Sequence, residues 1–577
     1  MIMVLRKMMM KTASSRSGLI MRINLVFLAF FLVLYSIVLL CPSASDYHHS
    51  SIVRCSLSEC HHRHHHKVLE NGVKMEVVLS AGELGKPRFL KGVGTGMKIG
   101  VVNMEEEDMS EWEAIGEVIP VPFQKVSPAM EWKDLFPEWI DEEEETDGPS
   151  CPEIPMPDFD RFGSLDMVVA GLPCRSPEEG WNRDVLRLQV HLVAANLAAR
   201  RGKKGTTTVV LRSKCTPMVE IFRCDEVAGR EGDWWLFRPD LDRLMHKVSL
   251  PVGSCNLAMP LWGKGINEAV NDVVSKRKTS ETTSQRQAYA TVLHSTEAYV
   301  CGAIVLAQSL RQTGTRRDLV LLLDAAISEP KRVALSRAGW KIRLIKRIRN
   351  PKAEKKSYNE YNYSKFRLWQ LTDYDKVVFI DSDIVVLRSL DGLFDFPQMS
   401  ATGNDGWIFN SGVMVIEPSN CTFRTLMNRR EEIVSYNGGD QGFLNEVFVW
   451  WHRLPRRVNF LKNFWSNTTA EAAVKNQLFG SDPPNLYSIH YLGWKPWLCY
   501  RDYDCNWDVP DRRVYASDVA HARWWRVHDA MEESLKAFCG LPDWRKKGLL
   551  RDRKVAGKLG LKDRHWRINV TDPRRFI

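Results

Sequence analysis

The second half of the sequence predicts an α/β domain with a mainly parallel sheet, and three observations support this fold class. Strand-like runs at 290–293, 320–323 and 342–345 alternate with helical patterns. A fourth run, 377–380, contains no polar residue, as expected for a parallel strand covered on both faces. Two acidic residues follow it, at the end where ligands bind in α/β sheets. We therefore expect a ligand site beyond the carboxyl ends of the strands.

The first element along the chain is an uncharged apolar run from Leu25 to Cys41, preceded by five basic residues. The first acidic residue after it is Asp46. This charge distribution predicts a cytosolic tail at 1–22 and a transmembrane signal anchor at 23–41, which would leave the remaining chain lumenal. A cleaved signal peptide ending in the small residues at 42–45 is the alternative, but the basic region is long for one.

Composition divides the chain between this run and the α/β domain. Residues 42–150 contain a histidine-rich tract and an acidic run, and they are expected to form a loosely ordered stem. A smaller α/β accessory module is expected at 151–274, because helical periodicity at 185–199 is followed by strand-like runs at 207–211 and 234–237. A polar linker at 275–287 follows the module.

The α/β domain is expected at 288–545, and a basic C-terminal tail at 546–577. After the first strand, Ser295 or Thr296 is the expected N-cap of a helix with apolar residues at helical spacing. Gly314 follows the end of this pattern, as glycine often does. This strand and helix form the opening unit of the domain.

The strongest motif is KVVFIDSD at 376–383. In a strand, residues i and i+2 point the same way, so Asp381 and Asp383 are expected to face one divalent cation together. The alternative for an isolated Asp-x-Asp is a solvated surface turn.

Four other segments favour a nucleotide-sugar site. FNSGVMVI at 409–416 places amide and hydroxyl groups at the head of a strand, and NGGDQG at 437–442 combines flexible backbone with polar side chains. IHYLGWKPW at 489–497 offers an imidazole and then a lysine that can reach a phosphate, while SKFRLW at 364–369 precedes the motif with two acids. Taken alone, each has a structural explanation, such as a core histidine or a turn before a helix.

Between about Ala290 and Trp497, the order and spacing of these segments resemble glycosyltransferase family 8, the glycogenin-type enzymes. The segment 358–371 and the long N-terminal extension are most similar to the plant glycogenin-like group, which includes the xylan α-glucuronosyltransferases. The resemblance implies the GT-A (Rossmann-like) nucleotide-sugar fold. It also implies retaining transfer from a UDP-sugar to an acceptor hydroxyl.

The resemblance further implies the residues of the site. A manganese ion (Mn2+) would be held by Asp381, Asp383 and His490, and oxygen ligands with one imidazole suit that ion. The catalytic candidates are Lys365, Asp405, Asp440, Gln441 and Lys495. The other donor-binding candidates are Leu293, Ser295, Tyr299, Lys356, Ser382, Asn410, Ser411, Gly412, Asn437, Gly438, Gly439 and Gly493.

Two departures from the glycogenin pattern matter. Only one residue separates Gly493 from Lys495, where glycogenins have two, so the lysine is open to a different position on the diphosphate. The segment 454–460 contains no tyrosine to match the one that glycogenins glucosylate on themselves. An external acceptor is therefore favoured.

The predicted function is transfer of glucuronic acid from UDP-glucuronate to xylan, in cell-wall synthesis in the Golgi membrane, where other wall-synthesis enzymes are candidate partners. The alternatives are a UDP-glucose or UDP-galactose transferase acting on glucan or a polyol, and an inactive scaffold of a polysaccharide synthase. A glucuronate carboxylate favours a nearby arginine, and Arg367 and Arg501 are candidates. The net charge of +10 is spread along the chain and no basic helix or RNA-binding pattern is present, so nucleic acid is not an expected partner.

A lumenal location is compatible with the cysteines and the glycosylation sequons. Thirteen cysteines permit disulfides without fixing their pairing, and an odd number leaves at least one outside intramolecular pairs. Asn-x-Ser/Thr sequons occur at Asn362, Asn420, Asn467 and Asn569. A glycan is not expected at Asn362, which lies within the donor-binding segment. Several of the 20 tryptophans follow the last motif. Each is expected to be either a sugar-binding residue or a core residue.

Overall fold

The computed structural model describes residues 96–137, 142, 151–174, 181–258, 286–294, 297–404, 407–464 and 469–574. The predicted cytosolic tail, the signal anchor and the linker up to residue 285 lie outside these ranges. Within the described ranges, no helix combines the length and apolar character needed to cross a bilayer.

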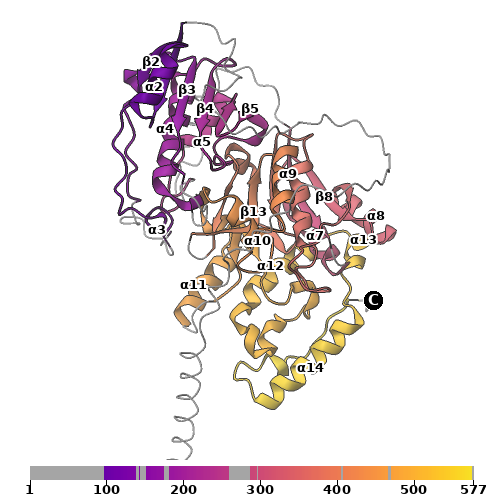
Figure 1. Cartoon of the computed structure of the whole chain (residues 1–577). Helices are drawn as coiled ribbons and strands as arrows, with labels where there is room; N and C mark the ends of the chain where they lie inside the picture. Colours follow the sequence, from indigo (N-terminus) through magenta and orange to yellow (C-terminus); the bar gives the residue numbers. More distant parts are fainter. Residues whose placement is uncertain are drawn as a thin grey trace, which may run out of the picture. The chain divides into compact units, whose positions relative to one another are not determined.

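The N-terminal domain contains a six-stranded sheet in the order β2-β1-β3-β4-β6-β5. Strands β2, β3, β4 and β5 of this sheet are labelled in Figure 1. Strands β2, β1, β3 and β4 are parallel, whereas β6 is antiparallel to both β4 and β5. The strands are β1 Met97–Val102, β2 Gly116–Pro120, β3 Met167–Gly171, β4 Thr208–Arg212, β5 Val227–Glu231 and β6 Trp234–Phe237. The helices are α2 Glu106–Glu113, α3 Trp132–Leu135, α4 Val185–Arg201 and α5 Leu241–Val248.

The predicted stem boundary at residue 150 is wrong. Strand β1 lies inside the N-terminal sheet between β2 and β3, and its residues Ile99, Val101 and Val102 are buried. Residues 97–137 therefore belong to the folded domain that we expected to begin at residue 151. The predicted helix and strands of this domain are confirmed, each to within two residues.

The catalytic domain contains a seven-stranded mixed sheet in the order β14-β12-β13-β10-β7-β8-β9. Its neighbours are parallel except for β13, which is antiparallel to both β10 and β12, so the prediction of a mainly parallel sheet is confirmed. The strands are β7 Gln287–Leu293, β8 Asp318–Asp324, β9 Lys341–Ile345, β10 Lys376–Ile380, β12 Ser400–Gly403, β13 Phe409–Ile416 and β14 His452–Leu454. A small second sheet joins β11 Ile384–Val386, β16 Ser488–His490 and β15 Phe460–Leu461.

The helices of the catalytic domain correct two predictions. Helix α7, Val300–Gln312, begins after a 3₁₀ turn with Tyr299 as its N-cap, so neither Ser295 nor Thr296 can cap it, and both lie outside the described residues. Helix α14, Asp543–Leu559, runs across the predicted boundary at residue 546. Because Arg574 donates to the carbonyl of Trp497 (2.8 Å), the C-terminal residues pack on the domain rather than form a separate tail. The remaining helices are α8 Glu329–Ala338, α9 Asn420–Arg429, α10 Asp440–Val447, α11 Thr469–Gly480, α12 Asp518–Asp529 and α13 Glu533–Lys536.

The two domains belong to one compact unit, Leu84–Ile577. The disulfide Cys224–Cys421 joins them, and Arg223 pairs with Glu417 beside it (3.3 Å). Among the cysteines that the structure describes, the other disulfides are Cys151–Cys255, Cys174–Cys215, Cys301–Cys539 and Cys499–Cys505. The sequon residue Asn362 is buried, which agrees with the expectation that it carries no glycan, while Asn420 and Asn569 are exposed.

Removing the disulfide between the domains is expected to lower the free energy of unfolding. The Cys224→Ser/Cys421→Ser variant opens a link between residues 197 apart, whereas Cys499→Ser/Cys505→Ser opens one between residues 6 apart. In the chain-entropy model the first loss exceeds the second by about 3 kcal/mol. Calorimetric unfolding of both double variants checks this, and equal losses would contradict it.

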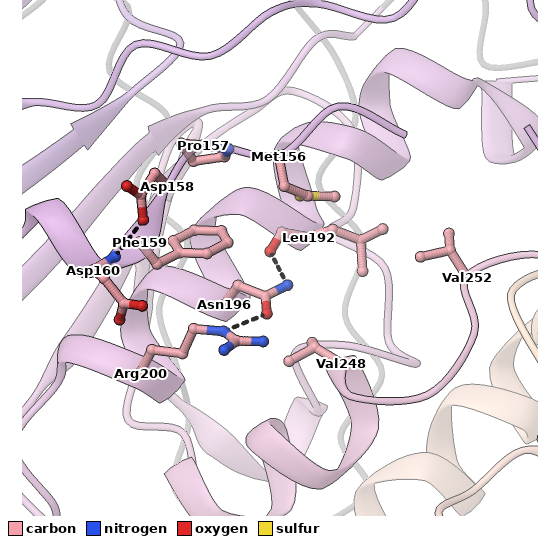
Figure 2. Close-up of a pocket in the computed structure, with 10 residues that line it drawn as sticks. All are labelled: Met156, Pro157, Asp158, Phe159, Asp160, Leu192, Asn196, Arg200, Val248 and Val252. Atoms are coloured by element: carbon pink, nitrogen blue, oxygen red, sulfur yellow. Dashed lines mark hydrogen bonds between the residues drawn. The ribbon is translucent and has the colours of Figure 1, made fainter. Parts of the chain in front are cut away.

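The N-terminal domain also contains a cavity of about 390 Å³ between α4 and residues 156–160 (Figure 2). Asn196 lies at its wall, where its side chain donates to the carbonyl of Leu192 and accepts from Arg200 Nε. No residue predicted for donor binding lines this cavity.

Candidate active site

The two motif carboxylates lie in a turn between the two sheets of the catalytic domain. We expected Asp381 and Asp383 to lie on one strand. Strand β10 ends at Ile380 and β11 begins at Ile384, so the two residues lie instead in the turn between these strands. The turn is closed by Ile384 N donating to Asp381 O (3.1 Å), and Asp381 N donates to Gly412 O on β13 (2.9 Å). The carboxylates converge because of this turn.

A third possible ligand comes from the small sheet. Strand β16 is antiparallel to β11 and places His490 opposite Ile384. One ligand atom from each of Asp381, Asp383 and His490 lies within 4.8 Å of the others, and His490 Nε2 is 3.3 Å from Asp383 Oδ1. The three residues predicted to hold the metal are therefore together.

A chain of amide groups orients the imidazole of His490. Asn459 donates from Nδ2 to Asn410 Oδ1 (2.8 Å), so its own Oδ1 accepts from His490 Nδ1 (3.0 Å). Gly412 N also donates to Asn410 Oδ1 (2.8 Å). With the proton on Nδ1, the lone pair of Nε2 faces the two carboxylates, and an outer partner of this kind is typical of metal-bound histidines. The donor set fits a divalent metal ion.

Replacing Gly412 with alanine is expected to weaken divalent-cation binding by about 10- to 100-fold. A Cβ at this position would lie 2.7 Å from His490 Cε1, which is too close for the ring to keep its place. Titration calorimetry with Mn2+ measures the change. Gly392→Ala is the matched control, because a Cβ there meets nothing within 4 Å. Unchanged affinity in the Gly412 variant would contradict this role of the glycine.

Two lysines balance the carboxylates, of which Lys365 is buried and Lys495 is partly buried. Lys495 Nζ is 2.6 Å from Asp383, and Lys365 Nζ is 2.6 Å from Asp440 and 3.5 Å from Asp381. Burial alone would raise the pKa of Asp383, but the ammonium group of Lys495 holds it well below its usual range. Burial raises the pKa of Asp381. Asp383 is therefore the more firmly ionised of the two carboxylates.

The start of α10 lies beside Lys365. Asp440 accepts from Ser411 Oγ (3.1 Å), and Gln441 Oε1 accepts from Ser411 N (3.1 Å). The turn before α10 contains Gly438, whose φ of 65° favours glycine. The arrangement places a carboxylate and an amide next to the cluster of acids and lysines, as expected for groups that orient a sugar.

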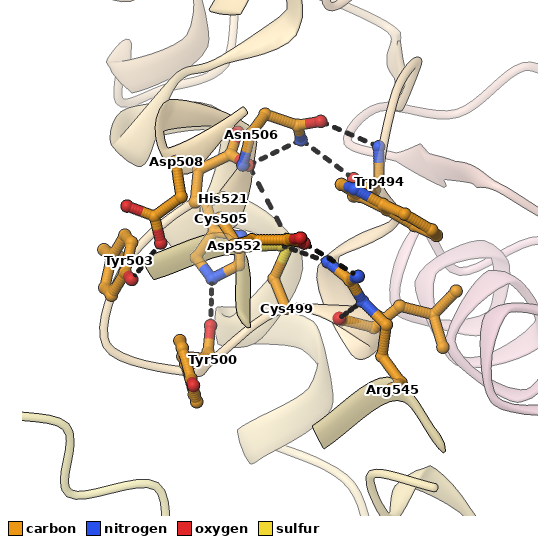
Figure 3. Close-up of a disulfide and its surroundings, with 12 residues drawn as sticks. Trp494, Cys499, Tyr500, Tyr503, Cys505, Asn506, Asp508, His521, Arg545 and Asp552 are labelled. Carbon is orange, nitrogen blue, oxygen red and sulfur yellow. Dashed lines mark hydrogen bonds and ion pairs between the residues drawn. A yellow bond between two sulfur atoms is a disulfide. The ribbon is translucent and has the colours of Figure 1, made fainter. Parts of the chain in front are cut away.

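Side chains near the disulfide Cys499–Cys505 hold Trp494, the residue before Lys495 (Figure 3). Gly493 has a φ of 74°, and a Cβ there would lie 2.5 Å from Asn506 Oδ1. The Asn506 side chain accepts from Trp494 N (2.8 Å) and donates to Trp494 O (3.0 Å). The guanidinium of Arg545 lies 3.6 Å from the centre of the Trp494 ring and donates to Leu498 O. This bracing fixes the position of Lys495.

A second recess lies at the carboxyl ends of β8 and β9, the edge of the sheet where a ligand site is expected. It has a volume of about 570 Å³, and Asp324, Arg347 and Tyr361 line it. Arg347 pairs with Asp324 (2.7 Å) and lies 4.0 Å from the Tyr361 ring centre. Tyr361 falls in the segment 358–371 that carries the family resemblance, whereas no motif in the sequence indicated Asp324 or Arg347.

Four other residues predicted for donor binding lie in different parts of the catalytic domain. Leu293 is buried at the end of β7, Tyr299 packs edge-on against Trp497, and the Ser382 carbonyl faces Gly302 of α7. Asn437 accepts from the backbone N–H groups of Gly439 and Gly442, so its side chain holds the turn before α10.

Lys356 is exposed, and the structure does not bring it to the acidic cluster; its backbone N–H donates to Glu360 (2.6 Å). Ser295 and Asp405 lie outside the described residues. The two arginines considered for a glucuronate carboxylate are engaged elsewhere. Arg367 donates to Gln370 and Lys346 O, and Arg501 pairs with Asp529.

Family models match both domains. Residues 290–403 match the model of glycosyl transferase family 8, and residues 86–255 match the model described as the GUX1-5 N-terminal domain. The second range includes β1 and β2, in agreement with the corrected boundary.

Three known proteins illustrate the similarity. UDP-glucuronate:xylan alpha-glucuronosyltransferase 2 of Arabidopsis thaliana is 58% identical over 596 residues, which cover 99% of each chain. Glycogenin-2 of Homo sapiens is 34% identical over 237 residues, covering 39% of this chain and 46% of the relative. Among solved structures, the galactosyltransferase LgtC with donor and acceptor sugar analogs is 19% identical with a TM-score of 0.31, covering 44% of this chain and 99% of that one.

Proposed function

Because this chain belongs to glycosyltransferase family 8, we propose that it transfers glucuronic acid from UDP-glucuronate to xylan, forming α-linked side chains with retention of configuration. The observation that carries the proposal is 58% identity to a UDP-glucuronate:xylan alpha-glucuronosyltransferase over 99% of both chains. A second relative with this activity in its name, transferase 1 of the same plant, is 50% identical over 84% of this chain. The cluster of acids and lysines supports an active enzyme rather than an inactive scaffold.

We propose Mn2+ as the cofactor, held by Asp381, Asp383 and His490. Two carboxylates and one imidazole suit this ion. When bound, a divalent cation supplies positive charge that stabilises the departing diphosphate.

The protein's own residues supply the rest of the chemistry. Lys495 lies next to Asp383, so its ammonium group is placed to stabilise charge on the leaving diphosphate. Lys365 and Ser411 hold the carboxylate of Asp440, which keeps it in one orientation toward the donor sugar. Gln441 is fixed by Ser411 N and presents a second polar group to that sugar. Positioning and charge stabilisation thus account for the roles of these residues.

We also propose that the chain is a single-pass type II protein of the Golgi membrane with a lumenal catalytic domain. The apolar run from Leu25 to Cys41 is preceded by five basic residues and no acidic one, which supports the anchor. Protease protection in microsomes tests it: the catalytic domain should resist digestion until detergent is added, and digestion of intact vesicles would contradict the topology.

The activity is tested with the solubilised full-length protein, Mn2+, xylo-oligosaccharides and one UDP-sugar at a time. The sugars are UDP-glucuronate, UDP-glucose, UDP-galactose and UDP-xylose, and product masses are recorded. A glucuronosyl adduct with UDP-glucuronate alone is the expected result. Transfer of another sugar would contradict UDP-glucuronate as the donor. No transfer despite UDP binding would contradict xylan as the acceptor.

A further inference from the structure

Trp407 is an exposed aromatic side chain at the edge of the active site. It is 48% exposed, although it lies three residues from Asn410, which belongs to the network that orients His490. Its loop is closed by Asn404 N donating to Ile408 O (2.9 Å). The Asn404 side chain accepts from Asn410 Nδ2 (3.2 Å). The loop that presents Trp407 is therefore bonded directly to the active-site network.

Contacts from both domains hold Trp407 in place. Trp451 Nε1 donates to Trp407 O (3.0 Å), and the guanidinium of Arg183 lies 5.0 Å from the centre of the Trp407 ring. Arg183 comes from the N-terminal domain and makes two hydrogen bonds of 3.0 Å to Glu446 of α10. A side chain that is already fixed loses little conformational entropy when it binds a ligand.

Helix α10 extends from the residues that orient the donor sugar to the position of Arg183 and Trp407. It begins with Asp440, and Glu446 lies six residues later, or about 9 Å along the helix axis. Arg183 and Trp407 thus lie beside one end of α10 while Asp440 and Gln441 lie at the other. A sugar chain whose reacting hydroxyl is at the donor extends over this distance.

We infer that Trp407, braced by Arg183, is a platform on which a sugar ring of the acceptor chain stacks, away from the ring that receives the transferred sugar. The inference rests on the proposed function, which makes the acceptor a polysaccharide. Pyranose rings present apolar C–H faces, and an exposed indole offers a flat apolar surface with a polar edge. The N-terminal domain then contributes to acceptor binding through Arg183.

The test compares Trp407→Ala with Trp407→Phe and with Trp544→Ala. Trp544 is the matched control, because it is 57% exposed and lies on α14, away from the loop of Trp407. With saturating UDP-glucuronate and solubilised full-length protein, KM is measured for xylo-oligosaccharides of increasing length. Loss of the platform should raise KM for long acceptors about tenfold, with little change for the shortest acceptor or in kcat. Phenylalanine should restore most of the affinity.

Arg183→Met should raise KM in the same direction, and adding it to Trp407→Ala should cause little further increase, because both act through one platform. Thermal stabilisation by UDP with Mn2+ should remain as in the wild type. If the wild type transfers to xylan and KM for long acceptors is unchanged in Trp407→Ala, the platform is overturned while the proposed function stands. No transfer to xylan by the wild type would overturn the proposed function, and the platform with it.

Discussion

Asp383→Asn is expected to reduce kcat/KM by about a thousandfold, equivalent to roughly 4 kcal/mol of transition-state stabilisation. The substitution preserves the size of the side chain but removes the charge that faces both His490 (3.3 Å) and Lys495 (2.6 Å). It also leaves the partly buried ammonium group of Lys495 without its carboxylate, and this unpaired charge repels an incoming metal ion. Thermal stabilisation by UDP with Mn2+ should be lost together with activity.

The control for this variant is Asp373→Asn. Asp373 is a half-exposed carboxylate that pairs with Arg343 on the surface, so it tests for a general effect of removing one negative charge. Both variants should fold, and only the Asp383 variant should lose the response to UDP with Mn2+. If the Asp383 variant retained this response, Asp383 would not be a ligand of the metal ion.

Continuous apolar runs made the catalytic sheet predictable. Residues 377–380 and 409–416 are buried along their whole length, and a run of this kind in an α/β pattern has few alternatives to a strand. Strand β2 was missed because Gly116–Pro120 is short and only partly buried, so it shows neither a continuous apolar run nor regular alternation. The acidic helix α2 beside it also matched the composition of a loosely ordered stem.

The charged residues of the site were predictable from their motifs, but the groups that orient them were not. Asn459 lies in the segment 454–460, and the only prediction for this segment came from its lack of a tyrosine. Its function depends on bonds to Asn410 and His490, which come from other parts of the chain. Asn506 and Arg545 brace the loop of Lys495 in the same way. An amide or guanidinium that bonds to distant side chains carries no local sequence signal.

The spacing of Gly493 and Lys495 illustrates how structure resolves an ambiguity of sequence. With one residue between them instead of two, the position of the lysine was open. In the structure Lys495 Nζ reaches Asp383 and also donates to Tyr491 O (2.6 Å). The shorter spacing therefore keeps the ammonium group within the cluster of acids.

Lys495→Met is expected to change two properties in opposite directions. Turnover should fall by about 10²- to 10³-fold, because a preorganised group that stabilises charge on the leaving diphosphate is lost. Binding of Mn2+ in the absence of nucleotide should instead tighten several-fold. Burial alone would lower the pKa of Lys495, but Asp383 and Tyr299 raise it, so the ammonium group is charged at neutral pH and competes with the metal ion for Asp383.

Titration calorimetry and single-turnover kinetics measure these two effects separately. Lys341→Met is the control, since Lys341 pairs with Asp318 at an exposed position on β9 and should affect neither property. Damage to the fold would weaken both metal binding and turnover, whereas the proposed electrostatic role weakens only turnover. Weaker Mn2+ binding in the Lys495 variant would therefore contradict competition between this lysine and the ion. Tighter Mn2+ binding together with slower turnover would support a role of Lys495 in stabilising the leaving diphosphate.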